Sequence, residues 1–197
     1  DTEEKPFYLS DGTTKDVPMM LQEAPFNYLS NDIIQAGEMP YGAGNYSMII
    51  LLPQNNKTLN DIIDELSNEN WNRWLSEFYE AEKVQIHLPK FKFEYKDSLN
   101  NELINMGMEI AFDSSDADFS KINPTGELYI SRVIHKTFIE VNEEGTEAAA
   151  VTMVEIIRSA IQETFFFVNQ PFIFVIKEKY TNSIIFIGKV MEPKYEE

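Results

Sequence analysis

The stretch from Glu143 to Gln162 constrains the fold more than any other part of the chain. It follows one predicted strand, Val133–Val141, and precedes another, so it has the place of a connection. A structureless connection of this length is uncommon in a compact domain and is usually functional. Yet the stretch contains no Pro, no Asn and a single Gly at its start, so the residues that make turns are missing. We therefore expect a connection with a function of its own.

The same stretch alternates with the period of a β-strand. The even positions are small and then β-branched, namely Thr146, Ala148, Ala150, Thr152, Val154 and Ile156. The odd positions form a mixed face that water can accept, and they include Glu147, Val151, Met153 and Glu155. Gly145 suits a hinge because it has no Cβ atom. A helix remains an alternative, since residues 143–157 are rich in Ala, Glu and Met, and the pattern alone leaves strand, loop and helix open.

The rest of the chain predicts an α+β protein that is richer in strand than in helix. A hairpin is expected to join Phe7–Ser10 to Asp16–Met20 through the turn Asp11-Gly12. Further strands are predicted at Phe26–Leu29, Tyr46–Leu52, Val84–Phe93, Val133–Val141, Phe172–Ile176 and Ile184–Val190. One helix is predicted to begin after Thr58, which can cap its first amides, and a second to carry Trp71 and Trp74 on one face. Leu99–Met106 predicts a third helix.

Composition excludes several classes of function. The formal net charge of −17 argues against nucleic acid and anionic membranes as partners, because both repel a negative protein. The chain has no Cys, which removes disulfides, thiol nucleophiles and thiolate metal sites. No segment approaches the roughly 18 apolar residues of a membrane span. The start at Asp1 resembles neither a signal peptide nor an initiator methionine, so we expect a cut or trimmed amino terminus.

Other motifs for catalysis or binding are weak. Two lone histidines without Cys argue against a transition-metal site, and His87 is interpreted as a structural strand residue. Asp113–Asp118 lacks the glycine and the distal Glu of a calcium loop, so it predicts a solvated turn. Tyr41–Asn45 also predicts a turn, because no helix start or Lys follows its glycines. No nucleophile motif is found, and we expect neither an enzyme nor a cofactor.

Several segments, in one consistent order, resemble the serpin family of serine protease inhibitors. Glu143 to Ala150 resembles the hinge of the reactive-centre loop of inhibitory serpins, and Phe166–Ile176 resembles the family's signature segment. The other similar segments are Val17–Met20, His87–Phe91, Val133–Lys136 and the ending Ile184–Val190 with Pro193.

The resemblance implies the carboxyl-terminal half of a single serpin domain over residues 1–197. It implies mostly antiparallel sheets, a few helices and a long reactive-centre loop at residues 143–162. Residue 1 would fall near the middle of a serpin, so we expect either a second chain that carries the amino-terminal half and completes the sheet, or a chain that has been truncated. We also expect an extracellular or periplasmic protein, although the sequence gives no direct evidence of location because no signal region is present in this chain.

The resemblance implies a suicide substrate for serine proteases, whose cleaved loop inserts into a sheet and traps the protease covalently. The hinge would consist of Glu143, Gly145, Thr146, Glu147, Ala148, Ala149 and Ala150. Spacing from Gly145 places the scissile position at Ser159, whereas counting back from Pro171 gives Ala160.

Arg158 lies next to both positions and fits a trypsin-like pocket, so we expect Arg158–Ser159 to be the reactive bond. Cleavage beside Ile157, Ser159 or Ala160 by elastase- or subtilisin-like proteases is the alternative, and an ordinary solvated charge is the simplest explanation of Arg158.

His135 matches the histidine that serpins keep in the strand beneath the loop, where it helps to gate the opening of the sheet. A histidine satisfied within the core is a simpler reading and is compatible with that role. A non-inhibitory serpin, acting as a carrier or chaperone, is the alternative function. The small residues Thr146, Ala148, Ala149 and Ala150 favour inhibition, because bulky or charged groups in the hinge would block insertion.

Overall fold

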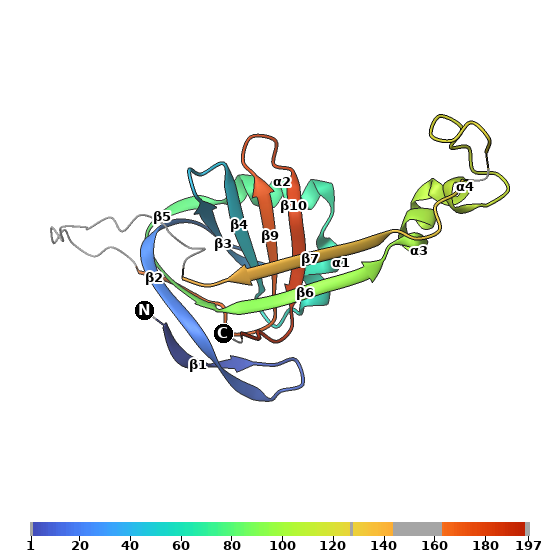
Figure 1. Cartoon of the computed structure of the whole chain (residues 1–197). Coiled ribbons are helices and arrows are strands. Elements are labelled where there is room, and N and C mark those ends of the chain that lie inside the picture. The colour runs from blue at the N-terminus through green and yellow to red at the C-terminus, as the bar shows by residue number, and fades with distance from the viewer. Residues whose placement is uncertain (1, 127, 144–162, 196–197) are drawn as a thin grey trace. The chain divides into compact units, whose positions relative to one another are not determined.

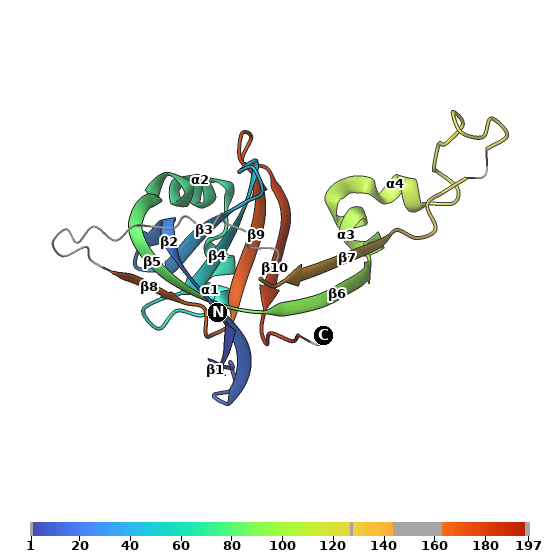
Figure 2. The same ribbon diagram turned by 60° about the vertical axis from the view of Figure 1, so that its left-hand side comes forward.

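The computed structural model describes residues 2–126, 128–143 and 163–195 of the chain. They form two compact units, one of Asp1–Lys92 with Glu140–Glu197 and one of Phe93–Ile139. The strands, labelled in Figures 1 and 2, are β1 (Thr2–Tyr8), β2 (Thr14–Ser30), β3 (Ile34–Tyr41), β4 (Tyr46–Pro53), β5 (Tyr79–Pro89), β6 (Phe91–Ser98), β7 (Ile134–Val141), β8 (Thr164–Phe167), β9 (Phe172–Glu178) and β10 (Ile184–Val190). The helical segments are α1 (Leu59–Glu65), α2 (Asn68–Glu77), α3 (Asn100–Leu103), the π-helical η1 (Ile104–Met108) and α4 (Glu109–Phe112).

An eight-stranded sheet dominates the first unit. Its order is β10-β9-β4-β3-β2-β5-β8, and β1 pairs with β2 beside this path. β5 and β8 run parallel, with Val84 opposite Thr164, whereas the other neighbours in this sheet are antiparallel. In the middle of the sheet β4 is buried from Ser47 to Leu52. The predicted strand Tyr46–Leu52 is therefore confirmed, and its unbroken apolar run reflects burial on both faces.

The long strand β2 forms the second arm of the predicted hairpin and continues well beyond it. It pairs with β1 at its start, with β5 along most of its length and with β3 at its end. The pairing register with β5 shifts between Ala24 and Phe26, at Pro25, whose nitrogen has no hydrogen to donate. The predicted strand at Phe26–Leu29 is confirmed, and it forms the end of β2 beyond the irregularity.

Two short helices cover one face of the sheet. Thr58 caps α1 through a capping box with Asp61, as its sequence predicts. Trp71 and Trp74 of α2 are buried. These side chains share a core with apolar residues of α1 and the sheet, namely Leu29, Ile34, Ala36, Ile49, Leu51, Leu59, Ile62, Ile173 and Val175. The helices are therefore stabilised mainly by the burial of their apolar face.

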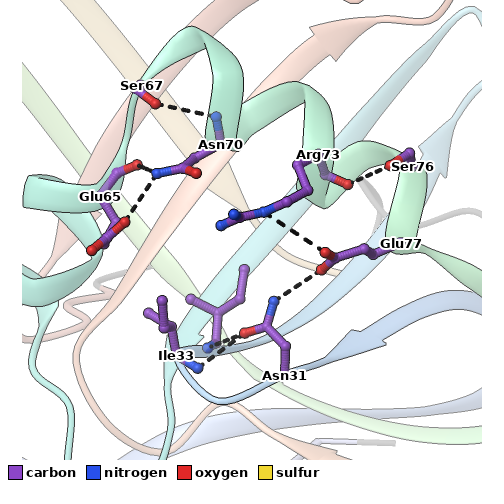
Figure 3. A network of polar contacts seen from close by, with 9 residues as sticks. Asn31, Ile33, Glu65, Ser67, Asn70, Arg73, Ser76 and Glu77 are labelled. Carbon is purple, nitrogen blue, oxygen red and sulfur yellow. Dashed lines mark hydrogen bonds and ion pairs between the residues drawn. The ribbon is translucent and has the colours of Figure 1, made fainter.

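A polar network ties the helices to the turn between β2 and β3 (Figure 3). The Asn31 amide donates to Glu77 Oε2 at 3.1 Å, and Arg73 Nε lies 3.8 Å from the other Glu77 oxygen. Asn70 Nδ2 donates to the Glu65 carbonyl at 2.7 Å, which joins the start of α2 to the end of α1. The network orients the helices. Because its polar groups are exposed to solvent, it contributes little to the stability of the fold.

A glycine and a phenylalanine fit together on the opposite face of the sheet. Phe166 of β8 is fully buried, and a Cβ atom on Gly37 of β3 would lie 2.9 Å from its Cε1 atom. Only glycine therefore lets this ring lie against the backbone of β3. The contact fixes β8, the strand that follows residues 144–162, to the body of the sheet.

The second unit contains most of a two-stranded sheet of β6 and β7, which run side by side in Figure 2. The helical segments α3, η1 and α4 follow β6, and Gly107 interrupts them with a φ of 98°. Leu99 N donates to the Val133 carbonyl at 2.9 Å, so the helical segment is held at the start of β7. The predicted helix at Leu99–Met106 and the predicted strand at Val133–Val141 are confirmed.

The predictions missed one strand boundary and two strands. The expected strand Val84–Phe93 is two strands, which change sheets at Lys90. β3 and β8 were not predicted, because β3 contains Gly and Pro and β8 is only four residues long. The turns at Tyr41–Asn45 and at Asp113–Asp118 are confirmed, the second by Asp113 accepting from the Ser115 amide at 2.7 Å.

We predict that Gly37→Ala destabilises the intact protein by about 1–3 kcal/mol, because its Cβ atom overpacks against the Phe166 ring. Urea unfolding measures the change. Phe166→Leu removes the ring atoms concerned, so Gly37→Ala should cost measurably less in that background than in the wild type. Equal costs in both backgrounds would show that the two residues are not coupled.

Candidate functional site

The predicted reactive segment has two described ends and a middle that lies outside the described residues. The hinge residues Gly145, Thr146, Glu147, Ala148, Ala149 and Ala150 lie outside them, as do Ile157, Arg158, Ser159 and Ala160. Glu143 and His135 are described, and so is the return of the chain at Glu163. The structure therefore describes the site at its two ends, Glu143 and Glu163.

At the amino end, the Glu143 carboxylate is held by two residues that are distant in sequence. Thr2 Oγ1 donates to Glu143 Oε1 at 2.5 Å, and Lys90 Nζ lies 3.0 Å from Oε2. These partners lower the pKa of Glu143 to about 2, with the Thr2 hydroxyl the largest cause and Lys90 a smaller one. We call Thr2, Lys90 and Glu143 the amino-end clamp. It requires the amino terminus and the β5–β6 junction to meet just beyond β7.

The Lys90 side chain is itself held in place. Its backbone N–H donates to the Pro18 carbonyl at 2.8 Å, so the chain turns from β5 into β6 against β2. Its Nζ atom also lies 4.2 Å from the centroid of the Tyr195 ring, a cation–π distance. The Tyr195 hydroxyl donates to Glu140 Oε1 at 3.0 Å, at the end of β7. The β1–β2 hairpin, the β5–β6 junction and the carboxyl-terminal tail therefore meet close to Glu143, where the segment starts.

β7, the strand that leads into the segment, has a neighbour on one side only in the described part of the chain, namely β6. Its side chains are mostly exposed, including those of His135, Ile134 and Phe138. His135 is therefore not a core histidine within the described structure. A two-stranded sheet with exposed apolar side chains is marginal in water by itself, and its free edge offers backbone groups to a further strand.

At the carboxyl end, an ion pair and a parallel ladder hold the returning chain. Lys83 Nζ lies 2.7 Å from Glu163 and 3.3 Å from Glu23. These two carboxylates raise the pKa of the Lys83 ammonium, Glu163 being the larger cause. β8 then pairs with β5, and Val168 N donates to the His87 carbonyl at 2.8 Å. The chain is thus fixed to the large sheet from Glu163 onward.

His87 is a buried strand residue, as its sequence context predicts. Its ring stacks on Phe167 with centroids 4.1 Å apart. Burial is the main cause that lowers the pKa of His87, and the nearby Lys5 adds to it. The imidazole is therefore uncharged at neutral pH.

The roles of Thr2, Lys83 and Lys90 were not predicted from the sequence. Each contacts a carboxylate at least 50 positions away in the chain, so no local motif announces it. Only Glu143 carried a signal, since it lies in the hinge-like segment. No helix among the described residues is long and apolar enough to cross a membrane.

Comparisons with known proteins agree on one family. The model described as "Serpin (serine protease inhibitor)" matches residues 1–193. Leukocyte elastase inhibitor A of Mus musculus is 40% identical over 201 residues, which cover 98% of this chain and 53% of that protein. Serpin B11 of Homo sapiens is 39% identical over 197 residues, covering 98% of this chain and 50% of that protein.

Solved structures also match almost the whole chain. The thermophilic serpin tengpin in its native state superposes with a TM-score of 0.81 at 36% identity, covering 97% of this chain and 50% of that chain. Native protease nexin-1 with heparin gives 0.83 at 32% identity, covering 98% and 52%. The chain thus spans about half the length of the proteins that it matches. These names state no compartment and lend no support to the predicted extracellular or periplasmic location.

We predict that Glu143 stays ionised down to about pH 2 in the folded protein. Because its pKa is lowered on folding, the clamp stabilises the fold above the ordinary Glu pKa of 4.5, and this contribution is lost as the pH falls from there towards 2. An NMR titration of side-chain carboxyl carbons measures the midpoint.

Thr2→Val removes the main donor to Glu143 and should move this midpoint towards 4.5. Thr14→Val, on the same hairpin, is the matched control and should leave it near 2. A midpoint that does not respond to Thr2→Val would contradict the clamp.

Proposed function

Because the chain belongs to the serpin family, with the sheet-rich α+β fold that its sequence predicts, we propose that the protein containing it inhibits serine proteases as a suicide substrate. The chain supplies the carboxyl-terminal part of one serpin domain, with residues 143–162 as the reactive-centre loop. An amino-terminal half completes that domain and is required for inhibition. The protein itself has no catalytic residues, since the chemistry belongs to the protease.

The observation that carries the proposal is the edge of β7 that no described strand of this chain pairs with. The strand enters the segment whose residues alternate with a period of two, and it has β6 as its one neighbour among the described strands. A strand edge with unpaired N–H and C=O groups accepts a further strand of the right pattern. The small even-numbered residues from Thr146 to Ala150 let the start of the loop enter such a sheet first.

The covalent step uses the ordinary chemistry of the protease. Its serine Oγ atom attacks the carbonyl carbon of the residue before the scissile bond and forms an ester with it. The peptide bond breaks, and the proton from the serine passes through the protease histidine to the new amino terminus of the loop. The loop then inserts before water can hydrolyse the ester.

Insertion is favourable enough to distort the bound protease. Fourteen residues at about 3.3 Å each span roughly 46 Å, so the protease is carried a long way. About a dozen new ladder hydrogen bonds contribute on the order of 1 kcal/mol each. Burial of Val and Ile side chains adds to this. Because acyl-enzyme hydrolysis depends on close positioning of a few atoms, such a distortion stops it.

Arg158–Ser159 is the proposed reactive bond. Arg158 suits a trypsin-like pocket that ends in a carboxylate. Relatives of this chain such as leukocyte elastase inhibitor A of Mus musculus are named as elastase inhibitors, which favours the competing bonds beside Ile157 and Ala160 for an elastase-like target. His135 on β7 remains the proposed gate of the sheet.

We predict that the complete two-half protein forms a covalent, boiling-resistant complex with trypsin on a denaturing gel. Thr146→Arg should abolish the complex and leave cleaved loop with active protease, because a long cation cannot enter the sheet interior. Loop cleavage without any complex in the wild type would instead support the non-inhibitory carrier or chaperone.

Glu147→Arg is the matched control for that experiment. It introduces the same side chain one position along, where the period of two places it on the water-facing side. The complex should persist. Loss of trapping in both variants, or in neither, would contradict insertion with this register.

Replacing Arg158 should change the target of the inhibitor. We predict that Arg158→Ala lowers the rate of trypsin trapping at least about 100-fold, because the charged contact in the specificity pocket is lost. Trapping of elastase should be kept. When the wild-type complex with trypsin is denatured, it should release a carboxyl-terminal fragment that begins at Ser159, which mass spectrometry can identify. A fragment that begins at another residue would reassign the reactive bond.

A further inference from the structure

Within this chain, β8 leaves two phenylalanines exposed just after residues 144–162. Phe165 and Phe167 are 47% and 46% exposed, and their rings stack with centroids 6.0 Å apart and planes at 9°. Phe166 between them is fully buried, so this pair is not needed for the core contact of the strand. Polar side chains would satisfy the exposed face of β8 equally well, and exposed aromatic rings concentrate at interaction sites.

The apolar surface extends across two more strands. His87 lies beneath Phe167 at 4.1 Å, and Leu21 of β2, 40% exposed, is directly opposite His87 in the β2–β5 register. Residues paired in this way share a face of the sheet. We call Phe165, Phe167, His87 and Leu21 the aromatic platform.

Charged groups border the platform on the side of the loop. Lys83 joins Glu163 and Glu23 into one cluster with two carboxylates and one ammonium, so this border is net negative. The whole chain carries a formal net charge of −17. The platform therefore favours a partner surface that presents apolar and cationic side chains, since cations also bind to the faces of aromatic rings.

We infer that the aromatic platform is a second contact surface for the target protease, separate from the residues that enter its active site. The inference rests on the proposed function. It names Phe165 and Phe167 as residues that determine which protease is captured, through a cationic and apolar patch beside the active-site cleft of that protease.

Chain length supports a protease as the occupant. Phe165 follows Ser159 by six residues, so at most about 22 Å of chain separates the platform from the proposed reactive bond. A protease of about 230 residues has a radius of gyration of roughly 17 Å. Its surface therefore reaches the platform while its active site holds Arg158–Ser159.

The test uses the complete two-half protein and trypsin whose catalytic serine is replaced by alanine. This probe binds without cleaving, so its Kd reports on docking alone. Phe165→Gln with Phe167→Gln should weaken the Kd about tenfold or more, as expected for two aromatic anchors. With active trypsin the trapping rate should fall by a similar factor, while the number of inhibitor molecules consumed per protease stays unchanged.

Two controls separate docking from folding. Tyr180→Gln removes an aromatic ring that is 78% exposed in the β9–β10 turn, and it should leave both the Kd and the trapping rate unchanged. Phe165→Gln alone keeps the His87–Phe167 stack, so it tests the platform even if the double variant folds poorly. Its Kd should weaken severalfold at an unchanged melting temperature.

The possible outcomes distinguish the two proposals. If the wild type forms no covalent complex but the Phe variants still weaken binding of the inactive protease, the trap fails and the platform stands. If the wild type traps trypsin while every Phe variant binds and traps like it, the platform is overturned. A lower melting temperature with an unchanged Kd also overturns it, because the rings then pack against the rest of the protein.

Discussion

Every N–H and C=O group along a β-strand needs a hydrogen-bond partner, and this requirement organises the whole molecule. In the large sheet it is met by strands that are far apart in sequence, such as β4 and β9. In the sheet of β6 and β7 it is met on one side of each strand within the described residues. In the proposed inhibitor, the edge of β7 that this chain leaves unpaired is where the amino-terminal half and the cleaved loop would supply further strands.

The two ends of the segment are held by different kinds of interaction. The amino end depends on the charged clamp at Glu143, which is half exposed and sensitive to acid and to salt. The carboxyl end depends on the ladder between β5 and β8 and on the burial of Phe166 against Gly37. Such an arrangement suits a loop whose amino-terminal part must leave its place after cleavage while its carboxyl-terminal part stays in the sheet.

The aromatic platform follows from the same geometry. Because β8 is fixed to β5, its two exposed rings keep a constant position next to the segment that, in the proposed mechanism, changes its own. A contact surface on the fixed strand can select a protease before the loop is cut and takes no part in the later insertion. Recognition and trapping would then be separate properties, carried by different residues of one short region.

The family, the α+β class and the main strands and helices could all be predicted from the amino-acid sequence. These depend on local patterns, such as the unbroken apolar run of β4 and the cap at Thr58, and on motifs that keep their order along the chain. The sequence also singled out the segment after Glu143, whose alternation breaks the rules for a connection.

The residues that hold the ends of that segment, and the surface beside it, could be found only from contacts between distant parts of the chain. Thr2, Lys83 and Lys90 act through carboxylates that are remote in sequence, and no spacing rule reaches over such distances. The exposure of Phe165 and Phe167 likewise depends on which face of β8 turns towards the core. Phe165, Phe166 and Phe167 are identical in the sequence, and the pairing of β8 with β5 alone makes the middle one a core residue and the outer two a surface.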